Sequence, residues 1–181
     1  MRRACFFDRD GVINVDYGYV GHVADFTLIS GIARALARIR QAGYLLILTT
    51  NQSGIARGRY SVGDFLTLSG HMQRLLAQDN AQFDGIYYCP HHPQGQVSAF
   101  VKDCSGRKPG PGMLMQAAQD FNLDLSSCLM IGDHAGDVLA AQTAGLSRLY
   151  LVGAHLHSEA ALCPQARCYR DVAALVQEEF K

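Results

Sequence analysis

The stretch Ala4-Cys5-Phe6-Phe7-Asp8-Arg9-Asp10-Gly11 decides the fold of this 181-residue chain. Its apolar run has no polar alternation, which is typical of a strand buried on both faces of a parallel sheet. The ligand crevice of an open parallel sheet lies beyond the carboxyl ends of its strands. We therefore expect Asp8 and Asp10 to project into a crevice and to share a divalent cation such as Mg²⁺, which prefers oxygen ligands. Taken alone, the motif also fits a simple Asp-Gly turn that closes a strand.

The rest of the chain alternates between apolar runs and segments of helical periodicity. Further strands are predicted at 44–49, 84–88, 127–131 and 149–152, and helices at 31–42, 62–78, 112–121, 135–144 and 171–180, the last with Asp171 as N-cap. This order predicts an α/β fold, a Rossmann-like open parallel sheet of about five strands with helices on both faces. The inserts are short, no large cap is expected, and residues 1–181 fit a single domain.

The charge balance narrows the range of partners. Lys plus Arg and Asp plus Glu number 16 each, so no basic surplus favours nucleic acid or an anionic membrane. No apolar run reaches the roughly 18 residues of a membrane span, and Asp8 comes too early for a signal peptide. We expect a cytoplasmic protein that binds a small molecule and, since no separate apolar cap or dimerisation helix is evident, a monomer.

Polar residues also follow two later strands. Thr50 and Asn51 end the second strand, and Asp133 follows the fourth, within Gly132-Asp133-His134-Ala135-Gly136-Asp137. Helix capping is an alternative explanation for the first of these groups. Arg107 and Lys108, in an irregular segment, add positive charge. A carboxylate nucleophile, a cation and groups that stabilise phosphoryl oxygens are the requirements of phosphoryl transfer through an aspartyl-phosphate.

In this order, DxDG at 8–11, Thr50, Lys108 and GDxxxD at 132–137 resemble the four motifs of the haloacid dehalogenase superfamily. A narrower resemblance, to heptose bisphosphate phosphatases, covers nearly the whole chain. It is carried by 8–11, by Thr-Asn-Gln-Ser-Gly-Ile-Ala-Arg-Gly at 50–58, by Cys-Pro-His-His-Pro-Gln-Gly at 89–95 and by Arg-Lys-Pro at 107–109. It implies a Mg²⁺-dependent phosphatase that removes the 7-phosphate of D-glycero-D-manno-heptose 1,7-bisphosphate in ADP-heptose and lipopolysaccharide core synthesis.

Two alternatives remain open at this point. Histidinol-phosphate phosphatases are similar, but they typically have TNQDG where this chain has Thr-Asn-Gln-Ser-Gly at 50–54. Turnover of each substrate would separate the two enzymes. A non-catalytic phosphosugar-binding protein with the same fold would be expected to lack Asp8, Asp10 or Asp133, and all three are present.

The resemblance also implies roles for individual residues. Asp8 would be the nucleophile and Asp10 the general acid and base, while Asp8, the Asp10 carbonyl and Asp133 would hold Mg²⁺. Thr50 and Lys108 would steady the phosphoryl group. The implied contacts to the sugar phosphate are Asp16, Tyr17, Gly18, Tyr19, Asn51, Gln52, Ser53, Arg107 and His134; the family has a lysine where this chain has His134.

A structural zinc is the last implied feature. Cys89 and His91 match the Cys-x-His pair of the family, and Cys104 matches its third ligand. Gly106 stands where the fourth ligand is expected, although a structural Zn²⁺ site normally has four protein ligands. His92 and Asp103 are the local substitutes, and a metal-free loop held by packing is the alternative.

Overall fold

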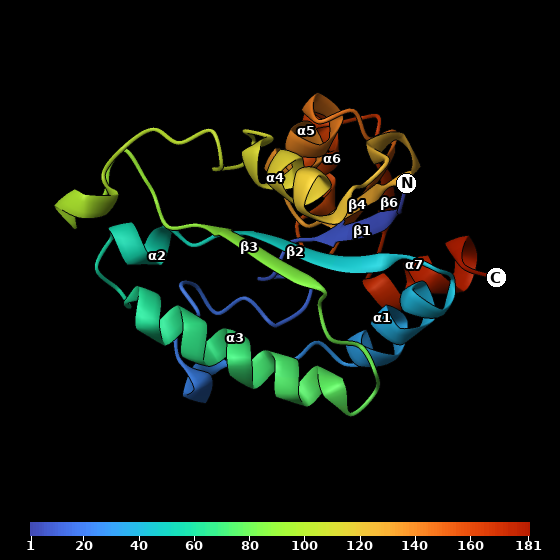
Figure 1. Cartoon of the computed structure of the whole chain (residues 1–181), viewed down its shortest axis with the longest axis horizontal. Coiled ribbons are helices and arrows are strands. Elements are labelled where there is room, and N and C mark those ends of the chain that lie inside the picture. Colours follow the sequence, from blue (N-terminus) through green and yellow to red (C-terminus); the bar gives the residue numbers. More distant parts are fainter.

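A six-stranded parallel sheet runs through the centre of the molecule in the computed structural model, which describes residues 1–181 (Figure 1). Its strand order is β3-β2-β1-β4-β5-β6. The strands are β1 (Ala4–Phe7), β2 (Leu45–Asn51), β3 (Gly85–Cys89), β4 (Leu129–Gly132), β5 (Arg148–Val152) and β6 (Arg167–Tyr169). The predicted class, an open parallel α/β sheet, is confirmed, with six strands in place of about five.

Helices cover both faces of the sheet, as Figure 1 shows. One face carries α1 (Ile32–Gln41), α3 (Val62–Ala77) and α7 (Val172–Glu179); the other carries α4 (Gly112–Phe121), α5 (Ala135–Thr143) and α6 (Leu156–Leu162). The short α2 (Ser53–Ala56) follows β2 closely, and single 3-10 turns lie at Val23–Asp25, Ser98–Phe100 and Leu125–Ser127. None of these helices combines the length and the apolar character needed to cross a bilayer.

The side chains of β1 point alternately to the two faces of the sheet, and this explains its uninterrupted apolar sequence. Cys5 and Phe7 belong to the hydrophobic cluster under α1, α3 and α7, whereas Ala4 and Phe6 belong to the cluster under α4 and α5. All four side chains are fully buried. Because each face of the strand packs against helices, no position is left for a polar residue.

Three short elements differ from the prediction, which missed α2, α6 and β6. In β6 the side chains of Arg167 and Cys168 are exposed, so this edge strand lacks the apolar run that identifies the others. Helix α6 contains no buried residue and therefore has no apolar periodicity. By contrast, Asp171 caps α7 as expected, since its Oδ1 accepts a hydrogen bond of 2.7 Å from the Ala174 N–H.

The position of β1 determines where the functional groups meet. Phe7, its last residue, pairs with Leu48 of β2 on one side and with Ile131 of β4 on the other. The strand order reverses here, and in open α/β sheets this switch point is where the crevice forms. Residues that follow β1, β2 and β4 are therefore brought together.

Candidate active site

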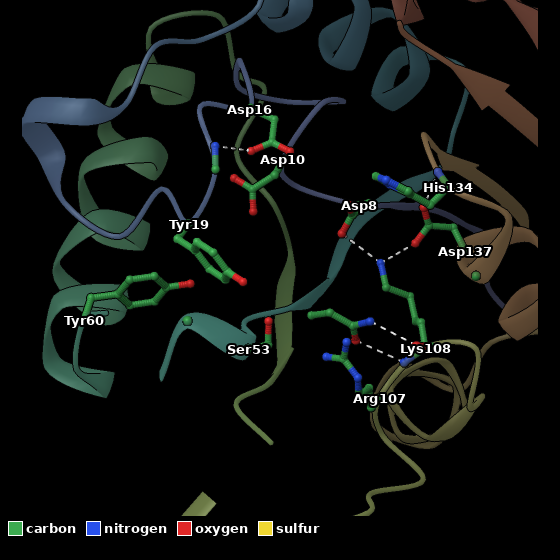
Figure 2. A pocket seen from close by; sticks show the side chains of 14 residues that line it. Asp8, Asp10, Asp16, Tyr19, Ser53, Tyr60, Arg107, Lys108, His134 and Asp137 are labelled. Atoms are coloured by element: carbon green, nitrogen blue, oxygen red, sulfur yellow. Dashed lines mark hydrogen bonds and ion pairs between the residues drawn. The ribbon is translucent and has the colours of Figure 1, made fainter. Parts of the chain in front are cut away.

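A cleft of ≈ 430 Å³ opens beyond the carboxyl ends of these strands (Figure 2). Polar and charged side chains form most of its wall. It is lined by Asp8, Asp10, Asp16, Gly18, Tyr19, Asn51, Ser53, Gly54, Tyr60, Arg107, Lys108, His134, Gly136 and Asp137. Most of the residues predicted to form a site are in this set.

A buried ion-pair triad lies at the floor of the cleft. The Lys108 ammonium is 2.8 Å from Asp8 Oδ1 and 2.5 Å from Asp137 Oδ1 (Figure 2). It also donates a hydrogen bond of 2.7 Å to the Thr49 carbonyl. Burial lowers the pKa of Lys108, but the two carboxylates outweigh burial and leave this pKa raised. Lys108 is therefore a permanent positive charge beside Asp8.

Asp133 lies buried at the end of β4, beside the floor of the cleft. Gly11 makes room for its carboxylate: the Gly11 φ is +80°, and a Cβ there would collide with Asp133 Oδ2. Burial raises the pKa of Asp133 to about 7; its hydrogen bond with His134 opposes this, while the charges of Asp8 and Asp137 add to it.

The electrostatics of this carboxylate group fit a divalent cation. Burial also raises the pKa of Asp8, and Asp137 contributes to the increase while Lys108 opposes it. Lys108 is the single cation paired with Asp8 and Asp137, so the group has excess negative charge. Carboxylate oxygens are the hard donors that Mg²⁺ prefers. The donors of Asp8 and Asp133 therefore suit this ion.

Asp10 is held by three different donors. Arg9, which is 1% exposed, donates from its NH2 to both carboxylate oxygens at 2.9 and 3.0 Å. Asn14 donates to Oδ1 at 3.0 Å, and Gln52 donates to Oδ2 at 3.2 Å. The carboxylate lines the cleft and is held in one orientation by these donors.

The residues at the end of β2 have separate positions. Asn51 and Ser53 line the cleft, whereas Thr50 and Gln52 are buried behind its wall with 1% exposure each. The side-chain amide of Gln52 donates hydrogen bonds to Asp10 and Thr50, and the Gln52 backbone N–H donates to the Cys89 carbonyl. The structure therefore does not bring Gln52 to the surface of the cleft.

The 16–19 segment forms a tight turn at the rim of the cleft. Asp16 Oδ1 accepts a hydrogen bond of 2.8 Å from the Gly18 N–H, and Gly18 and Tyr19 both have positive φ angles. Asp16, Gly18 and Tyr19 reach the cleft. Tyr17 does not line it, and its side chain is 63% exposed.

Arg107 and His134 complete the wall near Lys108. Arg107 NH1 is buried without a hydrogen-bond partner in the protein, although the residue lines the cleft. His134 Nδ1 lies 2.8 Å from Asp133 Oδ1, and this contact raises the His134 pKa to about 9. Both side chains thus offer donors to an anion in the cleft.

Sequence reasoning missed Tyr60. Its ring is buried, and its hydroxyl donates a hydrogen bond of 2.6 Å to Gln52 Oε1. Neither spacing nor a motif marks this residue. It reaches the cleft because its ring packs against Gly21 and Gly54 and its hydroxyl bonds to Gln52.

Cys89, His91 and Cys104 form a second cluster, as the resemblance implies. Their ligating atoms lie within 4.8 Å of one another, and burial raises the Cys89 pKa to about 11. Two thiols and an imidazole are donors that zinc accepts. A Cβ on Gly106 would lie 3.4 Å from Cys104 Sγ, so position 106 faces the cluster.

The two substitute ligands do not join this cluster. His92 Nδ1 accepts a hydrogen bond from the Gln94 N–H, and His92 Nε2 lies 3.1 Å from Arg57. Asp103 is exposed and lies outside the three-residue cluster. The cluster therefore offers two thiols and one imidazole as metal ligands, and no side chain supplies a fourth ligand at Gly106.

Comparisons with known proteins agree with this geometry. A family model described as HAD-hydrolase-like matches residues 105–175. The chain is 47% identical to a D-glycero-beta-D-manno-heptose-1,7-bisphosphate 7-phosphatase of Vibrio cholerae over 82% of this chain and 80% of that protein. It is 45% identical to the protein of the same name from Escherichia coli K12, over 82% of this chain and 78% of the other.

A solved structure is similar over nearly the full length. It is the D,D-heptose 1,7-bisphosphate phosphatase of B. bronchiseptica in complex with magnesium and phosphate. The two chains superpose with a TM-score of 0.86 at 33% identity, covering 98% of this chain and 97% of the other.

Proposed function

This chain belongs to the family of D-glycero-beta-D-manno-heptose-1,7-bisphosphate 7-phosphatases, and we propose that it hydrolyses the 7-phosphate of that sugar bisphosphate. The observation that carries the proposal is the ion pair of Asp8 with Lys108 at the floor of a polar cleft. A buried carboxylate beside a fixed cation suits a nucleophile whose product is an anionic acyl phosphate.

In the first proposed step, an Asp8 carboxylate oxygen attacks the phosphorus. The bond between phosphorus and the sugar oxygen breaks, its electron pair stays on that oxygen, and the Asp10 carboxyl group, protonated for this step, gives that oxygen its proton. In the second step a water molecule attacks the phosphorus, and the Asp10 carboxylate takes its proton. The bond to Asp8 then breaks and inorganic phosphate leaves.

Lys108 and Thr50 would stabilise charge during both steps. The Lys108 ammonium is held by Asp8, Asp137 and the Thr49 carbonyl, so it needs no reorganisation when negative charge develops beside it. Thr50 Oγ1 accepts a hydrogen bond from Gln52, which leaves the hydroxyl hydrogen unused by that contact. Thr50 is buried behind the cleft wall, so this hydrogen would donate to a phosphoryl oxygen at the floor of the cleft.

Magnesium would be held by Asp8, Asp133 and the Asp10 carbonyl. When bound, this ion offsets the charge of the phosphoryl oxygens. Support comes from the excess of buried carboxylates and from the space that Gly11 leaves beside Asp133. The homologous phosphatase of B. bronchiseptica was crystallised with magnesium and phosphate.

The remainder of the substrate would lie along the rim. Arg107 lines the cleft and suits a second phosphate, since guanidinium groups bind phosphate oxygens well. Asp16, Gly18 and Tyr19 on the opposite rim suit sugar hydroxyls, together with Ser53. His134, where the family has a lysine, would donate to the same substrate from the β4 side.

Zinc at Cys89, His91 and Cys104 is a structural proposal. Because the segment from Cys104 leads directly to Arg107 and Lys108, its order would set where both cations point. A metal that clamps this segment would stabilise it without entering the reaction. The proposed site has three protein ligands and an open position beside Gly106.

A substrate comparison tests the proposal. Phosphate release should be measured from D-glycero-β-D-manno-heptose 1,7-bisphosphate and from histidinol phosphate, each with and without Mg²⁺. We expect a much higher kcat/KM for the heptose bisphosphate and no turnover without the metal. A preference for histidinol phosphate would support the second candidate, which the polar cleft with Arg107 favours less because that substrate has one phosphate.

A further inference from the structure

Tyr60 belongs to a buried chain of hydrogen bonds that ends at two groups of the proposed mechanism. Its hydroxyl donates to Gln52 Oε1 at 2.6 Å, and Gln52 Nε2 donates to Thr50 Oγ1 at 2.8 Å and to Asp10 Oδ2 at 3.2 Å. Burial raises the Tyr60 pKa to about 12, so the phenol remains a donor. Every hydrogen-bonding atom of the Gln52 amide is occupied.

The orientation of this amide affects both acceptors. The ionised Asp10 carboxylate, which takes a proton from water in the second proposed step, only accepts hydrogen bonds and therefore needs the nitrogen end of Gln52. Thr50 can accept or donate. If the carbonyl end of Gln52 faced Thr50, the threonine hydroxyl would donate to it and would lose the hydrogen that we assign to the phosphoryl group.

The Tyr60 hydroxyl satisfies the opposite end of the amide. Gln52 is 1% exposed, so water cannot replace a lost donor to its carbonyl. A buried carbonyl without a donor is costly, and rotation of the amide toward other donors would relieve that cost. Such a rotation would break the contacts to Asp10 and Thr50 together.

Two glycines fix the position of the Tyr60 ring. A Cβ on Gly21 or on Gly54 would overlap the ring, and neither glycine has a positive φ. Their lack of a side chain therefore provides space, not backbone freedom. The ring lies between the segment that follows the 16–19 turn and α2, with its hydroxyl directed toward the cleft (Figure 2).

We propose that the Tyr60 hydroxyl is a positioning group that holds the Gln52 amide in the orientation that donates to Asp10 and Thr50. The inference rests on the proposed function for the roles of these two acceptors. On this proposal Tyr60 affects kcat indirectly, by orienting Gln52, and does not contact the reacting atoms.

A double-mutant cycle tests this route. Tyr60→Phe removes only the hydroxyl, and Gln52→Leu removes the amide through which it would act; Gln52→Met replaces the leucine variant if that one does not fold. Tyr88→Phe is the matched control. Tyr88 packs on Phe65 with a ring-centroid distance of 4.4 Å, and its hydroxyl does not belong to the series of hydrogen bonds from Tyr60 to Asp10 and Thr50. Each variant is assayed with any phosphate monoester that the wild type hydrolyses, so a wrong substrate assignment does not affect the comparison.

We expect Tyr60→Phe to lower kcat roughly tenfold, the effect of about one hydrogen bond, with KM changed less than about twofold. In the Gln52→Leu background the same change should alter kcat less than about twofold, and Tyr88→Phe should have no effect in either. An equal loss of kcat in both backgrounds, or an unchanged kcat for Tyr60→Phe alone, would overturn the proposal.

Discussion

The Asn51 side chain and the Lys108 backbone exchange two hydrogen bonds. Asn51 Nδ2 donates to the Lys108 carbonyl and the Lys108 N–H donates to Asn51 Oδ1, each at 3.0 Å. This pair fastens the end of β2 to an irregular segment whose sequence separation from it is 57 residues. The ammonium that contacts Asp8 is therefore positioned by an amide on a neighbouring strand.

Asn51→Leu tests that positioning. It leaves a donor and an acceptor of the buried Lys108 backbone unsatisfied, which typically costs about 1–3 kcal/mol for each group. We expect a lower free energy of unfolding, measured in urea, and a kcat/KM reduced at least about tenfold. Gln119→Leu, at an exposed amide on α4, is the control and should change neither. An unchanged kcat/KM for Asn51→Leu would mean that the ammonium contacts to Asp8, Asp137 and the Thr49 carbonyl hold Lys108 in place without Asn51.

Asp8→Asn should abolish turnover while the fold survives. The amide is close in shape to the carboxylate but cannot form an acyl phosphate, and it removes a negative charge from the proposed magnesium site. Circular dichroism should show native secondary structure, and mass spectrometry should find no phosphorylated enzyme. Asp79→Asn, at an exposed aspartate after α3, should be fully active. Normal turnover by Asp8→Asn would exclude Asp8 as the nucleophile.

Asp10→Asn should show a strong dependence on the leaving group. General acid–base catalysis contributes about 10²–10⁴-fold, so turnover of a sugar phosphate should fall by at least that order. p-Nitrophenyl phosphate releases a weakly basic phenolate that needs no proton, so formation of the phosphoenzyme from it should fall much less. A loss below about tenfold with the sugar phosphate would contradict the role of Asp10.

Glu179 provides a test of stability away from the cleft. It accepts hydrogen bonds from the hydroxyls of Tyr169 at 2.5 Å and Tyr150 at 2.9 Å, and Arg167 lies 2.6 Å away. Burial alone would raise the Glu179 pKa, but these donors outweigh burial and lower it. A carboxylate whose pKa is lower in the folded state contributes stability at neutral pH, and loses it as the pH falls through the folded value.

Glu179→Gln should therefore lower the free energy of unfolding at pH 7 by about 1 kcal/mol. The difference from the wild type should shrink as the pH falls below 4.5, the ordinary value for this group. The exposed neighbour Glu178 supplies the control, since Glu178→Gln should leave the free energy of unfolding unchanged at pH 7 and at pH 3. A difference that stays constant from pH 7 to pH 3 would show that the Glu179 charge has no part in it.

Gly106→Cys should complete a Cys₃His set. Position 106 faces Cys104 and does not have a positive φ, so a cysteine fits there without backbone strain. The variant should retain zinc through a chelator concentration that removes it from the wild type, as measured by metal analysis. Gly106→Ser is the matched control and should not tighten retention. Chelation of the wild type should raise KM before it unfolds the protein.

Zinc-free wild type with full activity in Mg²⁺ would contradict the zinc proposal. In that case the loop from Cys89 to Cys104 would hold its shape by packing alone. The zinc content of protein purified without chelator shows directly whether the wild type binds zinc.

The main elements were predictable from sequence because their signals are strong. Helices α1, α3, α4, α5 and α7 agree with the predicted ranges within a residue or two, since each buries one periodic face. The strands that build the site have uninterrupted apolar runs. Asp8, Asp10, Asn51 and Asp133 lie at or just after the ends of such runs, whereas Lys108 lies in an irregular segment and was assigned through the resemblance; all five meet at the cleft or beside it.

The features that escaped prediction depend on tertiary contacts. The Tyr60 ring fits where it lies only because Gly21 and Gly54 have no side chains, and no local pattern encodes that approach. The inward position of Gln52 depends on three partners from different segments. Tyr17 belongs to a motif that otherwise reaches the cleft, but Tyr17 itself does not line the cleft and is 63% exposed.

The position of the phosphate that leaves tests the central proposal most directly. ³¹P NMR can follow D-glycero-β-D-manno-heptose 1,7-bisphosphate with wild-type protein and Mg²⁺, beside the Asp8→Asn variant. We predict that the 7-phosphate resonance disappears, inorganic phosphate appears in equal amount, and the 1-phosphate remains, with no change in the variant sample. Loss of the 1-phosphate, or an intact bisphosphate in the wild-type sample, would contradict the proposed function.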